Sequence, residues 1–584
     1  MVMTTVVSPP ADVEVGTEVE AEPPSTRPAR SWRFLYVVGL AVLVGFGLRV
    51  AIGLTDGAPP TDETAFLRSG LSIVNNHGFD RTPGRPETHF PPFVPFLIGV
   101  ASKLFNDPHA GTVAVTCLAS TALIVPLALA ARQAAGPVAG MVTAWVAAIG
   151  PGLSTTFVTA GNGSEAVYTL MLVAGVWYVI SASSREGWAR RWRLAASGLC
   201  VGLGFLTRPE GLILAVPLAL AAAVPEFRAP TEGLSRLRAL ASRVAGGVPS
   251  VAVFALPLIL CVVPYLMFLH SNTGKWEVSA KAQDVSIEAW RAVANGDRHG
   301  RDQELYRLDG SGLELPKERT SLQGLAKQHP RAYAGIVGAN VRMLAQTVFV
   351  AEPGELAVWA LLPAPLWILV GLGAWRLRAS RTVRLLLVVA ALPLATALAF
   401  FVLTRYLVVV VAPATVFVGI AVASLPHRRR RPVLAGTMAL LAVSTIFAFH
   451  GGSGWWHPPD HTAQRHAGEW IATHTAPGDR IMTRSMVVEY YGQRSAVALP
   501  YGDYDQILNF ARHYGVRYLV LDPSTYRRLR PQLAFLMKVD FWPGLRLVHD
   551  ARGEEGKVRI FALDPVPPPD APMGPSLGFV GDSA

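Results

Sequence analysis

Runs of about 20 apolar residues recur along the chain, and a run of that length is what a helix needs to cross a hydrocarbon core of roughly 30 Å. We predict about eleven membrane spans on this basis. The composition agrees, because 51% of the 584 residues are hydrophobic and only 16% are charged. The predicted spans are residues 34–55, 110–131, 137–159, 164–183, 194–207, 209–224, 249–270, 356–375, 383–403, 407–424 and 432–450.

The distribution of arginine predicts how these spans are oriented, because short cytoplasmic loops accumulate Lys and Arg. Arginines cluster before the first span and in four later connections, within residues 27–33, 185–193, 228–243, 376–384 and 428–431. With these segments in the cytoplasm, the N-terminus is cytoplasmic and an odd number of crossings places the C-terminal part outside. We predict a multi-pass protein of the plasma membrane. The net charge of +11 then reflects topology, and no nucleic-acid partner is predicted.

Five segments outside the predicted spans can be assigned. Residues 1–33 have no hydrophobic periodicity and are predicted to be a disordered cytoplasmic tail, and residues 566–584 a loose C-terminal tail. The transmembrane domain, 34–455, carries external loops at 56–109 and 271–343. Residues 456–565 are predicted to form a small extracytoplasmic α/β domain, since 503–514 has helical amphipathicity and 517–521 has the pattern of a buried strand. The predicted fold class is therefore a polytopic α-helical membrane protein with this domain attached.

Two adjacent carboxylates, Asp62 and Glu63, follow the first span directly. Thr61 is a plausible N-cap, and a short helix in the membrane interface is predicted after it. Successive helical residues point about 100° apart, so the two acids should face different partners. Either they carry chemistry or they only cap the helix. The apolar stripe that predicts the helix consists of Phe66, Leu67, Gly70, Leu71 and Val74.

The acidic pair, the interfacial helix, and the downstream segments 90–95 (Phe-Pro-Pro-Phe-Val-Pro) and 101–105 (Ala-Ser-Lys-Leu-Phe) resemble the integral-membrane glycosyltransferases of the GT-C type. In particular, they are similar to the bacterial relatives of protein O-mannosyltransferases and of the aminoarabinose transferase of lipid A. The resemblance covers residues 34–450 and is strongest in the first 110. It implies a GT-C-like transmembrane domain and transfer of a sugar from a polyprenyl-phosphate donor.

Three charged residues at the predicted outer face match this group. Glu165 lies between the third and fourth spans, where the resemblance implies an acidic residue; the alternative is a side chain reaching from the interface into water. Arg208 and Glu210 lie in the turn 207–211, which resembles an Arg/Lys-Pro-Glu-Gly turn of related transferases. They are candidates for substrate binding, or for a mutual ion pair that only stabilises the turn.

Arg405 and Tyr406 stand between the ninth and tenth spans, where the group often has an arginine-tyrosine pair. Arginine binds phosphate oxygens in a bidentate manner, so Arg405 is the first candidate for the carrier phosphate. The alternative is an interfacial anchor. His89 precedes a Pro-Pro turn and is a weaker candidate for contact with a sugar or phosphate, with a surface histidine as the alternative.

These candidates predict an inverting transfer. Asp62 is the general base that takes the proton of an acceptor hydroxyl, and Arg405, with Arg208, stabilises the leaving phosphate. Glu63 and Glu165 position the substrate or the basic groups. The acceptor is a lipid, glycan or protein. No cofactor or obligatory metal is predicted, although a divalent metal stays possible. The alternatives are a multi-span transporter, or a cell-envelope assembly scaffold without catalysis.

Overall fold

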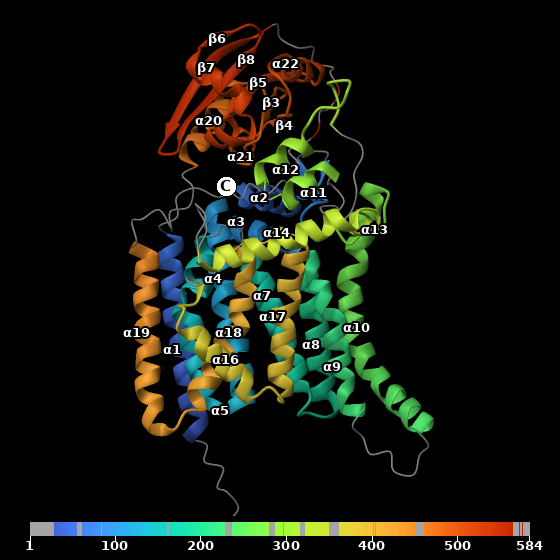
Figure 1. Ribbon diagram of the computed structural model, residues 1–584, viewed down its shortest axis with the longest axis vertical. Helices are drawn as coiled ribbons and strands as arrows, with labels where there is room; N and C mark the ends of the chain where they lie inside the picture. The colour runs from blue at the N-terminus through green and yellow to red at the C-terminus, as the bar shows by residue number, and fades with distance from the viewer. Residues whose placement is uncertain are drawn as a thin grey trace, which may run out of the picture.

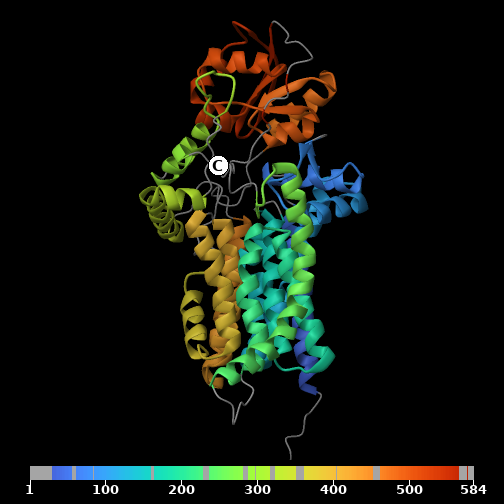
Figure 2. The same cartoon turned by 90° about the vertical axis from the view of Figure 1, so that its right-hand side faces the viewer.

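The computed structural model describes residues 29–54, 61–82, 85–159, 163–227, 236–279, 287–295, 297–315, 322–349, 361–400, 402, 404–450, 461–564, 572 and 575. A bundle of long helices forms one end of the molecule and a mixed sheet with short helices forms the other (Figure 1). A layer of shorter helices lies between them, as the view turned by 90° also shows (Figure 2). A site between the bundle and the sheet is therefore lined by residues of the bundle, the sheet and the layer of shorter helices.

The bundle contains the predicted apolar runs. Exposed Leu43, Leu256 and Leu260 on its outer helices are suited to a lipid environment. Arg49 is fully buried inside the first helix and donates hydrogen bonds to the carbonyls of Ala147, Ala148 and Leu153. The helices of the bundle are α1 (Ala29–Gly53), α4 (Pro108–Ala122), α5 (Ile124–Ile149), α6 (Pro151–Thr159), α7 (Ser164–Ala182), α8 (Gly187–Phe205), η1 (Pro209–Leu214), α9 (Ala215–Phe227), α10 (Arg236–Thr273), α16 (Leu366–Arg376), α17 (Arg381–Phe400), α18 (Thr404–Ala423) and α19 (His427–His450).

The chain reverses its direction inside α5. Ala135 and Gly136 have non-helical backbone angles, and the φ of 83° at Gly136 suits a residue without a Cβ. A Cβ on Gly140 would lie 2.6 Å from the carbonyl oxygen of Ala128, so the segments before and after Gly136 pack antiparallel. Arg49 contacts both Ser120 on α4 and Ala148 near the end of α5. The reversal separates the predicted spans 110–131 and 137–159.

Six helical stretches of the described chain are long and apolar enough to cross a membrane, and three shorter apolar helices accompany them. One of the six, Pro108–Val158, contains the reversal at Gly136 and so corresponds to two predicted spans. The class of helical membrane protein is confirmed. The count of eleven spans stays a prediction, since residues 350–360, which begin the predicted span 356–375, lie outside the described residues.

The intermediate layer comes from the two predicted external loops. The helix predicted after Pro60 is present as α2, and it crosses α3 so closely that a Cβ on Gly99 would lie 2.3 Å from the carbonyl oxygen of Gly70. Phe66, Leu67 and Gly70 are the buried residues of its apolar stripe. The elements of this layer are α2 (Thr61–Val74), β1 (Asp80–Thr82), β2 (Arg85–Pro86), α3 (Phe93–Phe105), α11 (Ile287–Ala294), α12 (Arg298–Leu305), α13 (Leu322–Gln328) and α14 (Pro330–Phe349).

The sheet at the far end has six strands in the order β4-β3-β5-β8-β7-β6. Strands β4, β3 and β5 are parallel, whereas β8, β7 and β6 continue antiparallel. Asp503 begins the predicted helix 503–514 with a capping box to Gln506. The elements are α20 (Thr462–His474), β3 (Arg480–Thr483), α21 (Met486–Gly492), β4 (Ser495–Ala498), α22 (Tyr504–His513), β5 (Val516–Leu521), η3 (Thr525–Leu529), η4 (Pro531–Lys538), β6 (Phe541–Trp542), β7 (Leu545–Gly553) and β8 (Gly556–Leu563).

Arginines of the predicted cytoplasmic connections gather at one end of the bundle. Each donates to a carbonyl of a neighbouring connection or helix end: Arg190 to Ala222, Arg381 to Ala221, and Arg376 to Ser424. The connection between α18 and α19, which contains Ser424, lies at the end opposite the sheet (Figure 1). The arginine-rich connections and the sheet therefore lie at opposite ends of the bundle.

Candidate active site

A buried ion pair joins two of the sequence-predicted residues at the sheet-facing end of the bundle. Glu165 lies in the first turn of α7, and Arg208 stands between α8 and η1. Arg208 Nη1 donates to Glu165 Oε1 at 2.8 Å, and Ser164 Oγ donates to Glu165 Oε2 at 3.0 Å. Arg208 Nη2 also lies 3.7 Å from Glu210 Oε1. The predicted pair of Arg208 with Glu210 is therefore present, but the shorter contact goes to Glu165.

Two tyrosines complete this group. The guanidinium carbon of Arg208 lies 4.6 Å from the ring centre of Tyr406, at the start of α18, and 5.8 Å from that of Tyr168. Such cation–π contacts are strongest where water is excluded. Tyr168 is three residues after Glu165 on α7, so both side chains lie on the same face of that helix. The structure thus brings together Glu165, Arg208, Glu210 and Tyr406, which the sequence indicated as separate candidates, and adds Tyr168.

The hydroxyl of Tyr168 is buried and has no hydrogen-bond partner among the described residues. A buried hydroxyl without a partner costs free energy unless a ligand or water satisfies it. The group therefore offers two buried polar atoms without a hydrogen bond, Tyr168 Oη and Glu210 Oε2, beside the guanidinium of Arg208. This is a suitable lining for a polar headgroup.

Arg301 lies on α12, with its guanidinium carbon 5.8 Å from the ring centre of Trp290. Burial lowers the pKa of Arg301, and the phenol of Tyr406 and carboxylate of Asp302 oppose that effect.

Glu63 has a different set of neighbours. Its side chain is 2% exposed, and Oε1 lies 3.6 Å from His109 Nδ1 on α4. Arg68 Nη1 on α2, the helix of Glu63, lies 3.1 Å from Glu489 Oε1 on α21, so α2 lies against the sheet unit, residues 461–564. Asp62 is in the first turn of the same helix, but its side chain lies outside the described part of the structure.

His89 is held through its backbone. Its amide donates to Glu87 Oε1 at 2.7 Å, and the amide of Phe90 donates to the same oxygen at 3.2 Å. The imidazole Nδ1 lies 4.0 Å from Glu87 Oε1. Glu87 is fully buried and was missed by the sequence reasoning, although an acid two residues before His89 was a readable signal. Glu87 therefore stabilises the turn that precedes α3 by accepting these two backbone hydrogen bonds.

The side chain of Arg405 lies outside the described residues, as does that of Asp62. Its neighbour in sequence, Tyr406, is described and contacts Arg208. The binding of a phosphate by Arg405 therefore stays a prediction. The contact of Tyr406 with Arg208 shows that the start of α18 lies beside the Glu165–Arg208 ion pair.

Residues 89–241 match the protein family described as dolichyl-phosphate-mannose-protein mannosyltransferase. The fold is similar to that of the archaeal oligosaccharyltransferase AglB from Archaeoglobus fulgidus in complex with an inhibitory peptide and a dolichol-phosphate. That likeness has a TM-score of 0.54 at 15% identity, and it covers 85% of this chain and 70% of that one. A search of curated proteins found no match.

The aminoarabinose transferase ArnT from Cupriavidus metallidurans is also similar, with 16% identity over 92% of this chain and 98% of that one. Its TM-score of 0.41 is too low to support an argument about the fold. The family match over residues 89–241 and the AglB-like fold agree with the resemblance to integral-membrane glycosyltransferases of the GT-C type. The resemblance predicted from the sequence is confirmed.

No group of three or more His, Cys, Asp or Glu residues suited to hold a metal ion occurs in the part of the chain that the structure describes. One structure of the Archaeoglobus fulgidus oligosaccharyltransferase is a complex with Zn and sulfate. The side chain of Asp62 is outside the described residues. The expectation that no metal is required therefore stays a prediction.

Proposed function

We propose that this protein transfers a sugar from a polyprenyl-phosphate donor to an acceptor hydroxyl at the outer face of the membrane, with inversion at the anomeric carbon. The observation that carries the proposal is the Glu165–Arg208 ion pair with Tyr406 against it, at the sheet-facing end of a GT-C-type bundle. The family match to dolichyl-phosphate-mannose transferases and the dolichol-phosphate held by AglB support a lipid-phosphate donor.

The guanidinium of Arg208 is suited to bind the leaving phosphate. It has five N–H donors, and the 2.8 Å contact with Glu165 uses one of them. The carboxylate fixes the orientation of the side chain before substrate arrives, and preorganised charge is what stabilises a developing anion without reorganisation. Arg405, in the first turn of α18 and next to Tyr406 in the sequence, supplies a second cation. Glu210 stays within reach of Arg208 and holds the turn.

Asp62 acts as the general base. It takes the proton of the acceptor hydroxyl while the acceptor oxygen bonds to the anomeric carbon. The bond between that carbon and the phosphate oxygen breaks, and polyprenyl phosphate leaves with the electron pair. General-base assistance of this kind contributes about 10² to 10⁴ in rate. Glu63, on the same helix as Asp62 and held beside His109 of α4, positions the acceptor. His89, next to the turn organised by Glu87, contacts the sugar or phosphate.

The outer face is assigned from charge. Arginine-rich connections lie at the end of the bundle opposite the sheet, which supports a cytoplasmic position for them and an extracytoplasmic position for residues 456–565. The intermediate layer with α2 then lies on the extracytoplasmic side, beside the outer leaflet of the plasma membrane. A polyprenyl donor reaches the site from that leaflet, and a lipid, glycan or protein acceptor reaches it from outside.

The test is to incubate the purified full-length protein with a panel of radiolabelled polyprenyl-phosphate sugars and candidate acceptors. We expect release of free polyprenyl phosphate, together with label on an acceptor, for at least one donor. A transporter or a scaffold without catalysis would leave every donor intact. Reporter fusions after residues 110, 340 and 460 test the orientation, and a cytoplasmic reporter at 460 would overturn the outer-face assignment.

A further inference from the structure

Helix α2, which has Asp62 and Glu63 in its first turn, is joined to the sheet unit by an ion pair. Arg68 Nη1 on α2 lies 3.1 Å from Glu489 Oε1 on α21. The side chain of Glu489 is 7% exposed and that of Arg68 is 20% exposed. A carboxylate that is this deeply buried is costly without its counter-ion, so α2 and α21 are held in the arrangement that keeps the pair together.

The contact with α21 and the crossing with α3 lie on nearly opposite sides of α2. Arg68 and Gly70 are two residues apart, so their directions on the helix differ by about 160°. The helix position of Asp62 differs from that of Arg68 by about 120° and from that of Gly70 by about 80°. Asp62 therefore occupies a position between the two contacts, and together they set the rotation of the helix that presents it.

The contact with α3 connects α2 to the proposed donor site. The amide of Phe93, at the start of α3, donates to the carbonyl of Leu206 at 2.9 Å, and Leu206 is two residues before Arg208. A Cβ on Gly111 of α4 would lie 2.6 Å from the amide nitrogen of Ser102 on α3, so these two helices also pack closely. The position of α3 is therefore fixed by the bundle.

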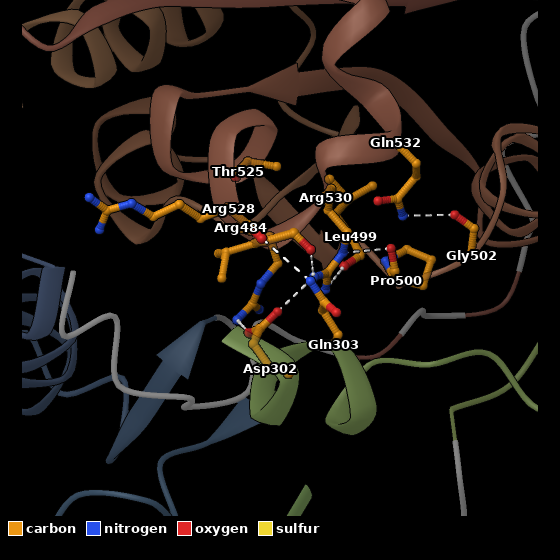
Figure 3. A network of polar contacts seen from close by, with 12 residues as sticks. Asp302, Gln303, Arg484, Leu499, Pro500, Gly502, Thr525, Arg528, Arg530 and Gln532 are labelled. Carbon is orange, nitrogen blue, oxygen red and sulfur yellow. Dashed lines mark hydrogen bonds and ion pairs between the residues drawn. The ribbon is translucent and has the colours of Figure 1, made fainter. Parts of the chain in front are cut away.

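The helix on the other side, α21, is fixed by the intermediate layer and by α20. Arg484, two residues before α21, donates from Nη2 to Asp302 of α12 at 2.5 Å, and Arg530 Nη1 donates to the same carboxylate at 2.7 Å (Figure 3). Asp302 is 1% exposed. A Cβ on Gly468 of α20 would lie 2.6 Å from the Cβ of Tyr491, so α20 packs closely on α21. Glu489 is consequently presented to α2 from a well-braced helix.

We infer that the sheet unit positions the general base of the proposed reaction, because the pair of Glu489 with Arg68 sets the place of α2, and with it Asp62, relative to the donor site. The inference rests on the proposed function and gives the C-terminal sheet a part in it. Glu489 and Arg68 are positioning residues, since they act through α2. A displacement of about 1 Å caused by a substitution far from the reacting atoms can cost about 10²-fold in rate.

Loss of the pair should lower turnover without changing the affinity for the donor lipid. The residues proposed to bind the carrier phosphate lie on α7, on α18 and in the turn after α8, and none of them is on α2. A split between turnover and donor affinity therefore separates a positioning role from a general loss of stability, which would affect both.

The experiment compares Glu489→Gln with Asp479→Asn in the purified full-length protein. Asp479 is a matched control, because it also lies 3.1 Å from an arginine, Arg517, and its side chain is also 7% exposed, but this pair lies within the sheet unit. We expect Glu489→Gln to lower the rate of sugar transfer about tenfold or more and to leave the affinity for undecaprenyl phosphate unchanged. Asp479→Asn should change neither quantity.

Hydrogen exchange tests the contact independently of activity. The protection factors of the α2 amides at residues 65–74 should fall in Glu489→Gln and stay unchanged in Asp479→Asn. Arg68→Gln removes the pair from the α2 side and is the second variant, in case Glu489→Gln does not fold. Combined with Glu489→Gln it should lower the rate no further than either single change, because both remove one interaction.

A normal transfer rate or unchanged protection of α2 in Glu489→Gln would overturn the inference while leaving the proposed function intact. An equal loss of rate in Asp479→Asn, or a loss of donor affinity in Glu489→Gln, would also overturn it. Absence of sugar transfer by the unmodified protein from every donor would instead remove the proposed function and this inference with it.

Discussion

Arg208 and Glu165, which are 43 residues apart in the chain, meet at 2.8 Å with most of both side chains buried. The contact ties the turn after α8 to the first turn of α7. Each charge makes the burial of the other tolerable, because an unpaired ion in such a place is costly. Glu165 thereby sets the direction in which the remaining N–H groups of Arg208 can meet a substrate.

Glu165→Gln should reduce sugar transfer about tenfold or more while the protein still inserts, because Arg208 loses its charged partner and its orientation. The measurement is transfer rate and thermal stability of the purified variant. Glu469→Gln is a matched control, since Glu469 also lies 2.8 Å from an arginine but in an exposed pair on α20. That substitution should have little effect. Equal behaviour of the two variants would show that the Glu165 pair has no special role.

Arg405→Ala should weaken donor binding by about 1.5–3 kcal/mol, the value of a charge-assisted hydrogen bond, with little effect on folding. Titration of a polyprenyl-phosphate sugar at normal expression level measures it. Arg405→Lys should recover only part of the affinity, since an ammonium group does not make a bidentate contact. Unchanged donor affinity and turnover in Arg405→Ala would assign this residue to the membrane interface.

Gly99→Ala should separate α2 from α3 and lower stability by about 1–3 kcal/mol, because the new Cβ would lie 2.3 Å from the carbonyl oxygen of Gly70. Transfer activity should fall too, since α2 carries Asp62 and Glu63. Thermal denaturation and turnover check both. The control is Gly338→Ala on α14, where no atom lies within 4 Å of the added Cβ. Full stability in Gly99→Ala would mean that the helices do not need this close crossing.

The contact of α12 with the sheet should be insensitive to pH in the neutral range and lost in acid. Burial disfavours the charged form of Asp302, but Arg484 and Arg530 more than offset this and lower the pKa of its carboxyl. A lowered folded-state pKa contributes stability above the ordinary carboxyl value of about 4, and this is lost as the pH falls through the folded value. The protection factors of the amides of residues 298–305, which are corrected for the intrinsic pH dependence of exchange, should therefore fall only below about pH 4. A fall in these protection factors between pH 8 and 5 would contradict this.

The sequence predicted the local elements well, because the information for them is local. The helix α2, the capped helix α22 and the strand β5 follow from apolar spacing and a capping residue. The position of the arginine-rich connections at one end of the bundle was likewise expected, because short cytoplasmic loops accumulate Lys and Arg. The buried pairing of Glu165 with Arg208 did not, since the neighbouring Glu210 was the nearer candidate in the chain and only the packing of α7 against α8 decides between them.

Contacts between residues far apart in the chain could not be predicted, because a local sequence pattern does not identify the partner. Asp302 meets Arg484 and Arg530, which are 182 and 228 residues away, and the polar helix around it resembles any exposed helix. Arg49 could have been noticed as an arginine inside an apolar run. Its partners are mostly backbone carbonyls, however, and no residue pattern identifies those.

The account depends most directly on Asp62, and the decisive measurement is turnover of a polyprenyl-phosphate sugar by Asp62→Asn. Asparagine keeps the size of the side chain and an oxygen able to cap α2, so a capping role would survive the change with little loss. We predict that turnover falls about 10²-fold or more while donor binding and membrane insertion are retained. Glu63→Gln should be milder. Near-normal transfer by Asp62→Asn would contradict the mechanism.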